Sequence, residues 1–256
     1  MTHLFSAAGR EALKALPLRR IVYAFDFDGT LAPIDADRQR VHIPSRIHTL
    51  VHDLSKLAPC AIVSGRSLDD LTPRVNGAAP YLIGNHGIES PFTHASVLAQ
   101  AHVCCQKWVR TVGEQAQVLK QEGVEIEDKS YSLTFHYRYA SDPTGIGNKL
   151  QHLFSRLDPA PRVVYGKSSV NVLPPGQWDK GAAVSSLTKF LQQDGAFYIG
   201  DEDTDEHVFE LNEGLALGVH VGRPLRSSAH FYINDQGEVE DVLRFLVQHL
   251  MESTIQ

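Results

Sequence analysis

The sequence predicts an α/β protein in which a doubly wound parallel sheet carries an inserted α+β domain. Two observations support this fold class. Short apolar runs alternate with segments of helical spacing over residues 1–90 and again over residues 174–256. Between them the alternation is replaced by a helix, a hairpin, a second helix and a second hairpin. We therefore expect residues 1–90 and 174–256 to form the core domain and residues 91–173 to form the inserted one.

The first part of the core domain reads as an alternation of helices and strands. Pro17 ends the first helical segment, and Pro44 opens the second. Ser67 and Asp70 have the spacing of a helix cap, which places another helix directly after them. Helices are expected over 4–16, 44–57 and from 67, and strands over 21–25, 60–63 and 81–83.

Periodicity also predicts the helices and strands of the inserted domain and of the second part of the core. Pro174, Pro175 and Gly176 mark the exit from the inserted domain. In that domain we expect one long helix over 98–119, strands over 124–127 and 130–137, a helix over 147–157, and strands over 162–165 and 169–172. In the core we then expect a helix from 178 to 191, strands over 197–201, 215–219 and 231–233, and a closing helix over 239–250.

The bulk composition excludes several classes of protein. The 256 residues are 43% hydrophobic and 21% charged, which is ordinary for a soluble globular protein. No apolar run is long enough to span a membrane, and the N-terminal segment does not resemble a signal peptide. The three cysteines, two of them adjacent, make a poor disulfide framework, so we expect a cytoplasmic location. The net charge of −6 argues against a nucleic-acid partner.

Two aspartates, Asp26 and Asp28, come directly after the first buried strand and are followed by Gly29 and Thr30. Carboxylates so close together repel each other unless a cation or a proton lies between them. Mg²⁺ prefers such oxygen ligands together with phosphate oxygens, and Gly29 allows a sharp turn that brings backbone N–H groups near an anion. The alternative is a plain Asx turn at the end of a strand. The whole run favours a metal and phosphate site.

Three further polar clusters occupy corresponding places in the core. Ser64 follows the second predicted strand, Lys180 lies in the first turn of a helix, and the acidic run Asp201 to Asp205 follows another strand. Ligand sites of open α/β sheets lie at the carboxyl ends of the strands, so we expect these clusters to meet Asp26 and Asp28 there.

The order Asp-x-Asp-Gly-Thr, Ser-Gly-Arg, Lys and Gly-Asp-x-x-Thr-Asp resembles the haloacid dehalogenase superfamily of phosphotransferases. Within it, residues 20–245 resemble the trehalose-6-phosphate phosphatases. The further matches are the runs 83–89, 127–129 and 133–138 and the pair Gly166-Lys167. The resemblance implies a Rossmann-like core with a cap domain, Mg²⁺ as the cofactor, and hydrolysis of trehalose 6-phosphate to trehalose and phosphate. It also implies a separate trehalose-6-phosphate synthase as the neighbouring enzyme; we expect a monomer.

The resemblance also assigns roles to the core residues. Asp26 is the nucleophile that forms an aspartyl phosphate, and Asp28 is the general acid and base. Asp26, the backbone carbonyl of Asp28, and Asp201 hold the metal ion, while Asp205 orients this shell. Lys180, Ser64 and Thr30 bind the phosphoryl oxygens.

Other residues are implied to contact the substrate. Several of them also have a plain structural interpretation, which stays open at this point. Arg66 at the start of a helix and Lys129 and Arg138 beside a strand are also typical of solvated surface charges, and His86 between glycines also suits a turn. The expected substrate contacts are Arg66, Asn85, His86, Glu127, Lys129, His136, Arg138 and Lys167.

Two departures from the family pattern leave the sugar open. Val170-Asn171-Val172 stands where a valine–glutamate–isoleucine run is usual, and Trp178-Asp179 precedes Lys180 where asparagine is usual. Asn171 brings the sugar contact at that position into question. The alternatives are a phosphatase of sucrose phosphate or of a glucosyl or mannosyl conjugate, a phosphomannomutase-type phosphotransferase, and a catalytically inactive sugar-phosphate sensor.

Overall fold

The computed structural model describes residues 1–35, 37–166, 168–211 and 215–253, and the chain divides into two units. The first unit combines Met1–Phe92 with Asp179–Gln256, and the second is Thr93–Trp178. The second unit therefore includes Pro174 to Trp178, which the sequence analysis had placed in the core domain. Each unit has a sheet and a buried core of its own.

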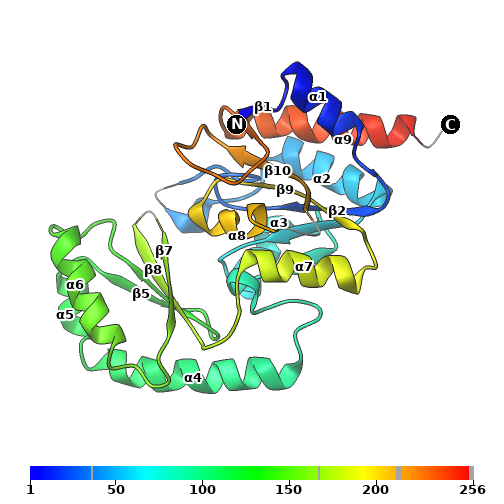
Figure 1. The fold of residues 1–256 in the computed structure, drawn as a ribbon. Helices are drawn as coiled ribbons and strands as arrows, with labels where there is room; N and C mark the ends of the chain where they lie inside the picture. Colours follow the sequence, from blue (N-terminus) through cyan, green and yellow to red (C-terminus); the bar gives the residue numbers. More distant parts are fainter. Residues whose placement is uncertain (36, 167, 212–214, 254–256) are drawn as a thin grey trace. The chain divides into compact units, whose positions relative to one another are not determined.

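The first unit is built on a seven-stranded sheet in which every neighbouring pair of strands is parallel (Figure 1). This confirms the predicted α/β class. The two-residue strand β1 at the edge was not predicted, because two residues carry no periodicity. Across the sheet the order is β1 (Thr2–His3), β11 (Phe231–Ile233), β10 (Leu215–Val221), β9 (Gly195–Gly200), β2 (Ile21–Phe25), β3 (Cys60–Val63) and β4 (Tyr81–Ile83).

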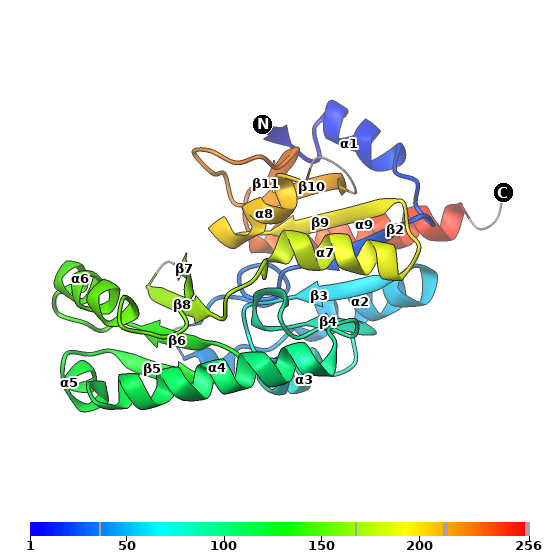
Figure 2. The same cartoon turned by 60° about the horizontal axis from the view of Figure 1, so that its bottom comes forward.

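Helices cover both faces of this sheet, as the buried central strand β2 requires. Its side chains alternate, so that Tyr23 and Phe25 join the core formed with α2 and α9, whereas Val22 and Ala24 join the core formed with α7. Figures 1 and 2 show α7 and α9 on opposite sides of the strands. The helices of the unit are α1 (Ala7–Lys14), α2 (Ser45–Leu57), α3 (Leu68–Val75), α7 (Lys180–Phe190), α8 (Glu206–Phe209) and α9 (Val239–Glu252).

The second unit is an α+β structure with an antiparallel four-stranded sheet. One face of the sheet packs on helices, and the ring of Phe135 meets that of Phe154 with their centroids 5.0 Å apart. The opposite face carries polar side chains, among them Thr134 and Asn171. The strand order is β5 (Glu125–Asp128), β6 (Leu133–His136), β8 (Ser169–Leu173) and β7 (Arg162–Gly166), and the helices are α4 (Ala95–Gly113), α5 (Ala116–Gln121) and α6 (Pro143–Phe154).

Three element boundaries in the second unit differ from the prediction. The expected long helix is split in two after Gly113, a residue of low helix propensity. Helix α6 begins at Pro143 because Asp142 caps it by accepting a hydrogen bond from the N–H of Gly145. Strand β6 begins only at Leu133, since Ser130 takes a positive φ of 67° and turns the chain.

Short 3₁₀ turns join these elements in the described ranges: η1 (Arg38–Arg40), η2 (Asn85–Gly87), η3 (Asp203–Asp205) and η4 (Gln236–Glu238). Two of them, η2 and η3, come directly after strands β4 and β9 and so carry polar residues at the carboxyl edge of the sheet. Within the part of the chain that the structure describes, no helix has both the length and the apolar character needed to cross a bilayer.

Candidate active site

The carboxyl ends of three adjacent strands, β9, β2 and β3, bring the predicted clusters to one edge of the sheet. Phe25 at the end of β2 lies in register with Ile199 of β9 and Ile62 of β3. The residues that follow these positions, Asp26, Asp201 and Ser64, therefore leave the sheet side by side.

Lys180 is the buried cation of this edge. Its ammonium lies 2.7 Å from Oδ1 of Asp26 and 2.8 Å from Oδ1 of Asp205, and its side chain is 2% exposed. It occupies the first position of α7, whose N-terminus Asp179 caps by accepting a hydrogen bond from the N–H of Ala182. The helix start thus fixes the ammonium between two carboxylates.

A second layer of contacts holds Asp205. The hydroxyl of Tyr198 donates to its Oδ1 at 2.5 Å, and the backbone N–H of Glu202 donates to its Oδ2 at 2.9 Å. Tyr198 was not predicted as a site residue, because within the run Phe197 to Ile199 it reads as one more strand residue. The one signal is general: the hydroxyl of a fully buried tyrosine usually has a hydrogen-bond partner.

Lys180 alone does not balance the negative charges at this edge. Burial raises the pKa of Asp26 well above its ordinary value; Lys180 opposes this effect, whereas Asp205 and Asp201 add to it. Burial also raises the pKa of Glu202. For Lys180, burial would lower the pKa, but the two carboxylates beside it outweigh burial and the pKa is raised. One ammonium therefore faces an excess of carboxylates.

Three of these carboxylates could hold a metal ion. Asp26, Asp201 and Asp205 each offer an oxygen atom, and the three atoms lie within 4.8 Å of one another. Hard divalent cations bind such all-oxygen donor sets. The residues present therefore fit a divalent metal, which would also offset the excess negative charge.

Gly29 lets the loop after β2 approach the acidic cluster. It has a φ of +82°, and a Cβ atom built on it would lie 2.3 Å from an oxygen of the Asp201 carboxylate. A side chain at this position would therefore displace Asp201 as well as strain the backbone. The glycine of the Asp-x-Asp-Gly-Thr run is thus explained by close packing as well as by the turn.

Asp28 pairs with Arg66, whereas Asp26 pairs with Lys180. The guanidinium of Arg66 donates from Nε to Oδ2 of Asp28 at 2.7 Å and from Nη2 to Oδ1 at 2.6 Å. Arg66 also donates to Asp70 at 2.6 Å. Arg66 is therefore not a solvated surface charge, because two carboxylates of the protein hold its guanidinium. A contact between Arg66 and the substrate stays a prediction.

Ser64 and Thr30 are both buried at this edge. The Ser64 hydroxyl accepts a hydrogen bond from the N–H of Arg66 at 3.1 Å. The Thr30 hydroxyl makes no hydrogen bond to any residue that the structure describes. A buried hydroxyl without a partner costs free energy, which favours a role for Thr30 in ligand binding.

Asn85 and His86 lie in the turn after β4, both with positive φ. The amide of Asn85 donates to the buried Glu89, and Glu89 also accepts from the N–H of Leu68 at the start of α3. The ring of His86 lies against Gly65, where an added Cβ would be 2.6 Å from the ring. These contacts give Asn85 and Glu89 a clear structural role; the predicted substrate contacts of Asn85 and His86 stay predictions.

In the second unit, three of the predicted substrate residues form one cluster on the polar face of the sheet. Nε2 of His136 lies 2.9 Å from Oε2 of Glu127, and the ammonium of Lys129 lies 3.9 Å from the same oxygen. The side chain of Lys129 is 8% exposed, so it is not the solvated surface charge considered above. Arg138 is exposed in the turn after β6, and Lys167 lies outside the described residues.

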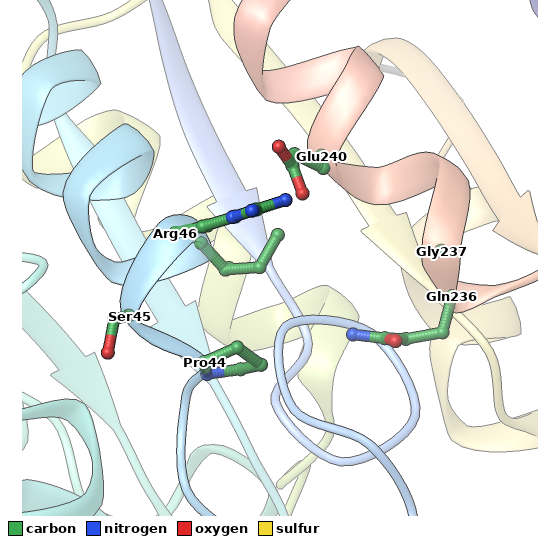
Figure 3. Close-up of a pocket in the computed structure, with 7 residues that line it drawn as sticks. Pro44, Ser45, Arg46, Gln236, Gly237 and Glu240 are labelled. Carbon is green, nitrogen blue, oxygen red and sulfur yellow. The ribbon is translucent and has the colours of Figure 1, made fainter.

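A separate cavity of about 350 Å³ lies elsewhere in the first unit, at the start of α2. Arg46 from α2 and Glu240 from α9 reach it from two sides, and Gln236 borders it (Figure 3). None of its lining residues belongs to the acidic edge, so the candidate active site is defined by the strand ends and not by this cavity.

Comparisons with known proteins agree on one family. The family model described as trehalose-phosphatase matches residues 24–229. A relative named Probable trehalose-phosphate phosphatase 9, from Oryza sativa subsp. japonica, is 33% identical over 94% of this chain and 74% of its own length.

Solved structures show the same fold. A trehalose-6-phosphate phosphatase related protein has a TM-score of 0.74 at 22% identity, covering 91% of this chain and 99% of its own. The sucrose-phosphatase of Synechocystis sp. PCC6803 has a TM-score of 0.57 at 19% identity, covering 90% and 98%.

A divalent cation should raise the melting temperature of the protein, because it binds the folded cluster and relieves its charge excess. At about 100 times its Kd, Mg²⁺ should raise Tm by roughly 5–10 °C in a thermal scan. Asp201→Asn should lose most of this rise. Asp203→Asn, which changes an exposed neighbour, should keep it. An equal rise in both variants would show that the cation binds elsewhere.

Proposed function

Because this chain belongs to the trehalose-phosphatase family, we propose that it hydrolyses trehalose 6-phosphate to trehalose and inorganic phosphate through an aspartyl phosphate. Membership of the family makes it a phosphoric monoester hydrolase with a sugar phosphate as substrate. The observation that carries the proposed route is the buried Asp26, held 2.7 Å from Lys180 and beside Asp201 at the strand ends. The cytoplasmic location, the monomeric state and a separate synthase as pathway neighbour belong to the same proposal.

The metal ion in this proposal is Mg²⁺. Asp26, the backbone carbonyl of Asp28, and Asp201 would hold it. Asp205 would orient this shell, consistent with its oxygens accepting hydrogen bonds from Lys180, Tyr198 and the N–H of Glu202. When bound, Mg²⁺ would neutralise negative charge shared between the nucleophile and the phosphoryl oxygens.

The nucleophile is Asp26. One of its carboxylate oxygens attacks phosphorus, the bond from phosphorus to O6 of the sugar breaks, and the sugar oxygen takes a proton from Asp28. A water molecule then attacks the phosphorus of the aspartyl phosphate while Asp28 takes its proton. Phosphate leaves, and the Asp26 carboxylate is restored. The two carboxylates have different neighbours, Lys180 beside Asp26 and Arg66 beside Asp28, so their surroundings differ as two different roles require.

The remaining phosphoryl oxygens are bound by Lys180, Ser64 and Thr30. Lys180 keeps its charge because the surrounding carboxylates raise its pKa, although burial alone would lower it. The Thr30 hydroxyl is buried with no hydrogen-bond partner among the described residues, so a phosphate oxygen would satisfy it.

The second unit supplies the contacts that select the sugar. Trehalose is a molecule of hydroxyl groups, and a site that hydrogen-bonds hydroxyls rejects ligands lacking them, because its own polar groups are then left unpaired. Glu127, Lys129 and His136 form the polar cluster that supports this role. Arg138 and Lys167 complete the proposed set.

A phosphatase of a different sugar phosphate is the second candidate. Asn171, which stands in place of the usual glutamate, uses its amide within the sheet: its Oδ1 accepts from the hydroxyl of Thr134 at 2.6 Å, and its Nδ2 donates to the carbonyl of Val164 at 3.4 Å. A charged sugar contact at this position is therefore missing. The likeness to the sucrose-phosphatase concerns the fold alone and does not favour sucrose phosphate.

Phosphate release from a panel of sugar phosphates separates these candidates. The purified protein with Mg²⁺ should release phosphate from trehalose 6-phosphate with a kcat/KM at least about a hundredfold above that for sucrose, glucosyl or mannosyl phosphates. Release should need no bisphosphate activator and should stop when the cation is chelated. A higher kcat/KM for another sugar phosphate would replace the proposed substrate, and a requirement for a bisphosphate would indicate a mutase.

Asp26→Asn should abolish turnover, since an amide does not attack phosphorus. Asp28→Asn should slow it by roughly 10²–10⁴-fold, the range typical of general acid–base catalysis. Phosphate release by purified variants checks both, with circular dichroism as the control for folding. Substantial turnover by Asp26→Asn would rule out the covalent route through this residue.

Lys129→Ala should lower kcat/KM for trehalose 6-phosphate by about tenfold to a thousandfold, because a buried ammonium of the sugar-selecting cluster is lost. Hydrolysis of a small aryl phosphate should change little, since this substrate needs only the core residues. Arg138→Ala should behave in the same way. Lys120→Ala, in an exposed turn of α5, is the matched control and should affect neither substrate. Equal losses on both substrates would place Lys129 or Arg138 in phosphoryl transfer instead.

A further inference from the structure

Asp28 is the first member of a network of alternating charges that runs back into the first unit. The network consists of Asp28, Arg66, Asp70 and Arg74, which we call the Arg–Asp network. Each ion pair in it has a closest N–O distance of 2.6 Å. Asp28 belongs to the residues proposed above for the chemistry, and Arg66 is a predicted substrate contact. Asp70 and Arg74 have neither role.

Arg66 fixes the plane of the Asp28 carboxylate. It binds both oxygens of this carboxylate through two parallel N–H donors, a geometry that a guanidinium provides and an ammonium does not. Its side chain is 11% exposed and lies over the ring of Phe27, with the guanidinium carbon 5.5 Å from the ring centroid. The orientation of Asp28 therefore depends on where Arg66 is held.

Arg66 is held by Asp70 in the first turn of α3. Nη1 of Arg66 donates to Oδ2 of Asp70 at 2.6 Å, while Oδ1 of Asp70 accepts two hydrogen bonds from Arg74. Burial would raise the pKa of Asp70, but hydrogen bonds from Arg74 and Arg66 outweigh this effect and lower the pKa. Asp70 is thus charged and has both of its oxygens in use.

Arg74 anchors the far end of the network. Its Nη1 donates to the backbone carbonyls of Gln39 and Val41, each at 2.9 Å, and its side chain is 8% exposed. These carbonyls belong to the segment that leads from the loop after β2 into α2. Arg66, Asp70 and Arg74 follow one another at intervals of four residues, the spacing at which side chains meet on a helix.

We propose that Asp70 and Arg74 are positioning residues for the reaction, and that they act through Arg66 to hold the Asp28 carboxylate in the orientation needed for proton transfer. This inference rests on the proposed function, because the orientation of Asp28 matters only if Asp28 is the general acid and base. A misplacement of about 1 Å in a reacting group can cost a hundredfold in rate, so a network outside the reacting atoms can have a measurable effect.

The first test is Asp70→Asn. This variant keeps the size of the side chain but replaces the carboxylate with a neutral amide, so at this end Arg66 keeps only neutral acceptors, including the backbone carbonyl of Arg38 at 3.3 Å. The kcat for trehalose 6-phosphate should fall by about tenfold, while KM should stay within about twofold of wild type, because no substrate contact is removed. Asp69→Asn, on the exposed side of the same helical turn, is the matched control and should leave both constants unchanged.

The second test combines Asp70→Asn with Asp28→Asn. If the network acts through Asp28, adding Asp70→Asn to Asp28→Asn should lower kcat no further. A loss caused by general loosening of the fold would instead persist in the double variant. Thermal unfolding of all four proteins measures that loosening directly. Arg74→Lys serves as a milder variant, because it keeps the charge but not the double anchor, and it should lower kcat by less than Asp70→Asn does.

The outcomes distinguish this inference from the proposed function. A wild-type kcat in Asp70→Asn, with Asp28→Asn strongly impaired, would overturn the positioning role alone. A tenfold loss that persists in the Asp28→Asn background would overturn it as well and assign Asp70 to stability. Full turnover by Asp28→Asn would overturn both the acid–base role and the inference built on it.

Discussion

The structure depends most on the balance of charge at the carboxyl edge of the parallel sheet. Asp26, Asp201 and Asp205 meet there because the adjacent strands β2 and β9 end in register, and Lys180 is the one buried ammonium between them in the described part of the chain. Carboxylates held so closely in a buried site are unfavourable unless cations compensate them. Lys180 offsets part of the charge, and a divalent metal would offset more. The same charge excess would help to bind such a metal.

The second constraint is that Asp28 must not share the environment of Asp26. The two residues are separated by a single phenylalanine, yet their carboxylates pair with different cations. Asp26 pairs with the point charge of a lysine, and Asp28 with the planar fork of an arginine. The proposed reaction, in which one carboxylate attacks phosphorus and the other transfers a proton, relies on this difference in surroundings.

The fold and the meeting of polar residues at one edge of the sheet could be predicted, because both depend on local sequence patterns. Apolar runs predict the central strands, and polar residues directly after those runs are expected at the carboxyl edge of the sheet. Tyr198 escaped prediction since a tyrosine within an apolar strand carries no sign of its hydroxyl bond to Asp205. The pairing of Arg66 with Asp28 joins residues 38 positions apart, and no periodicity reports such a contact. The break between α4 and α5 follows Gly113, whose low helix propensity is not visible in the apolar stripe that continues on both sides of it.

The two departures from the family pattern have different physical meanings. Asp179 caps α7 through its side-chain oxygen, and aspartate and asparagine are about equally good at this position, so the change leaves Lys180 in place. Asn171 is different, because an amide satisfied by Thr134 and a backbone carbonyl brings no charge to the polar face of the second unit. The carboxylate of the polar cluster on that face is Glu127, which His136 and Lys129 already contact. In the proposed function, selection of the sugar would therefore depend more on this cluster than it would if position 171 carried a glutamate.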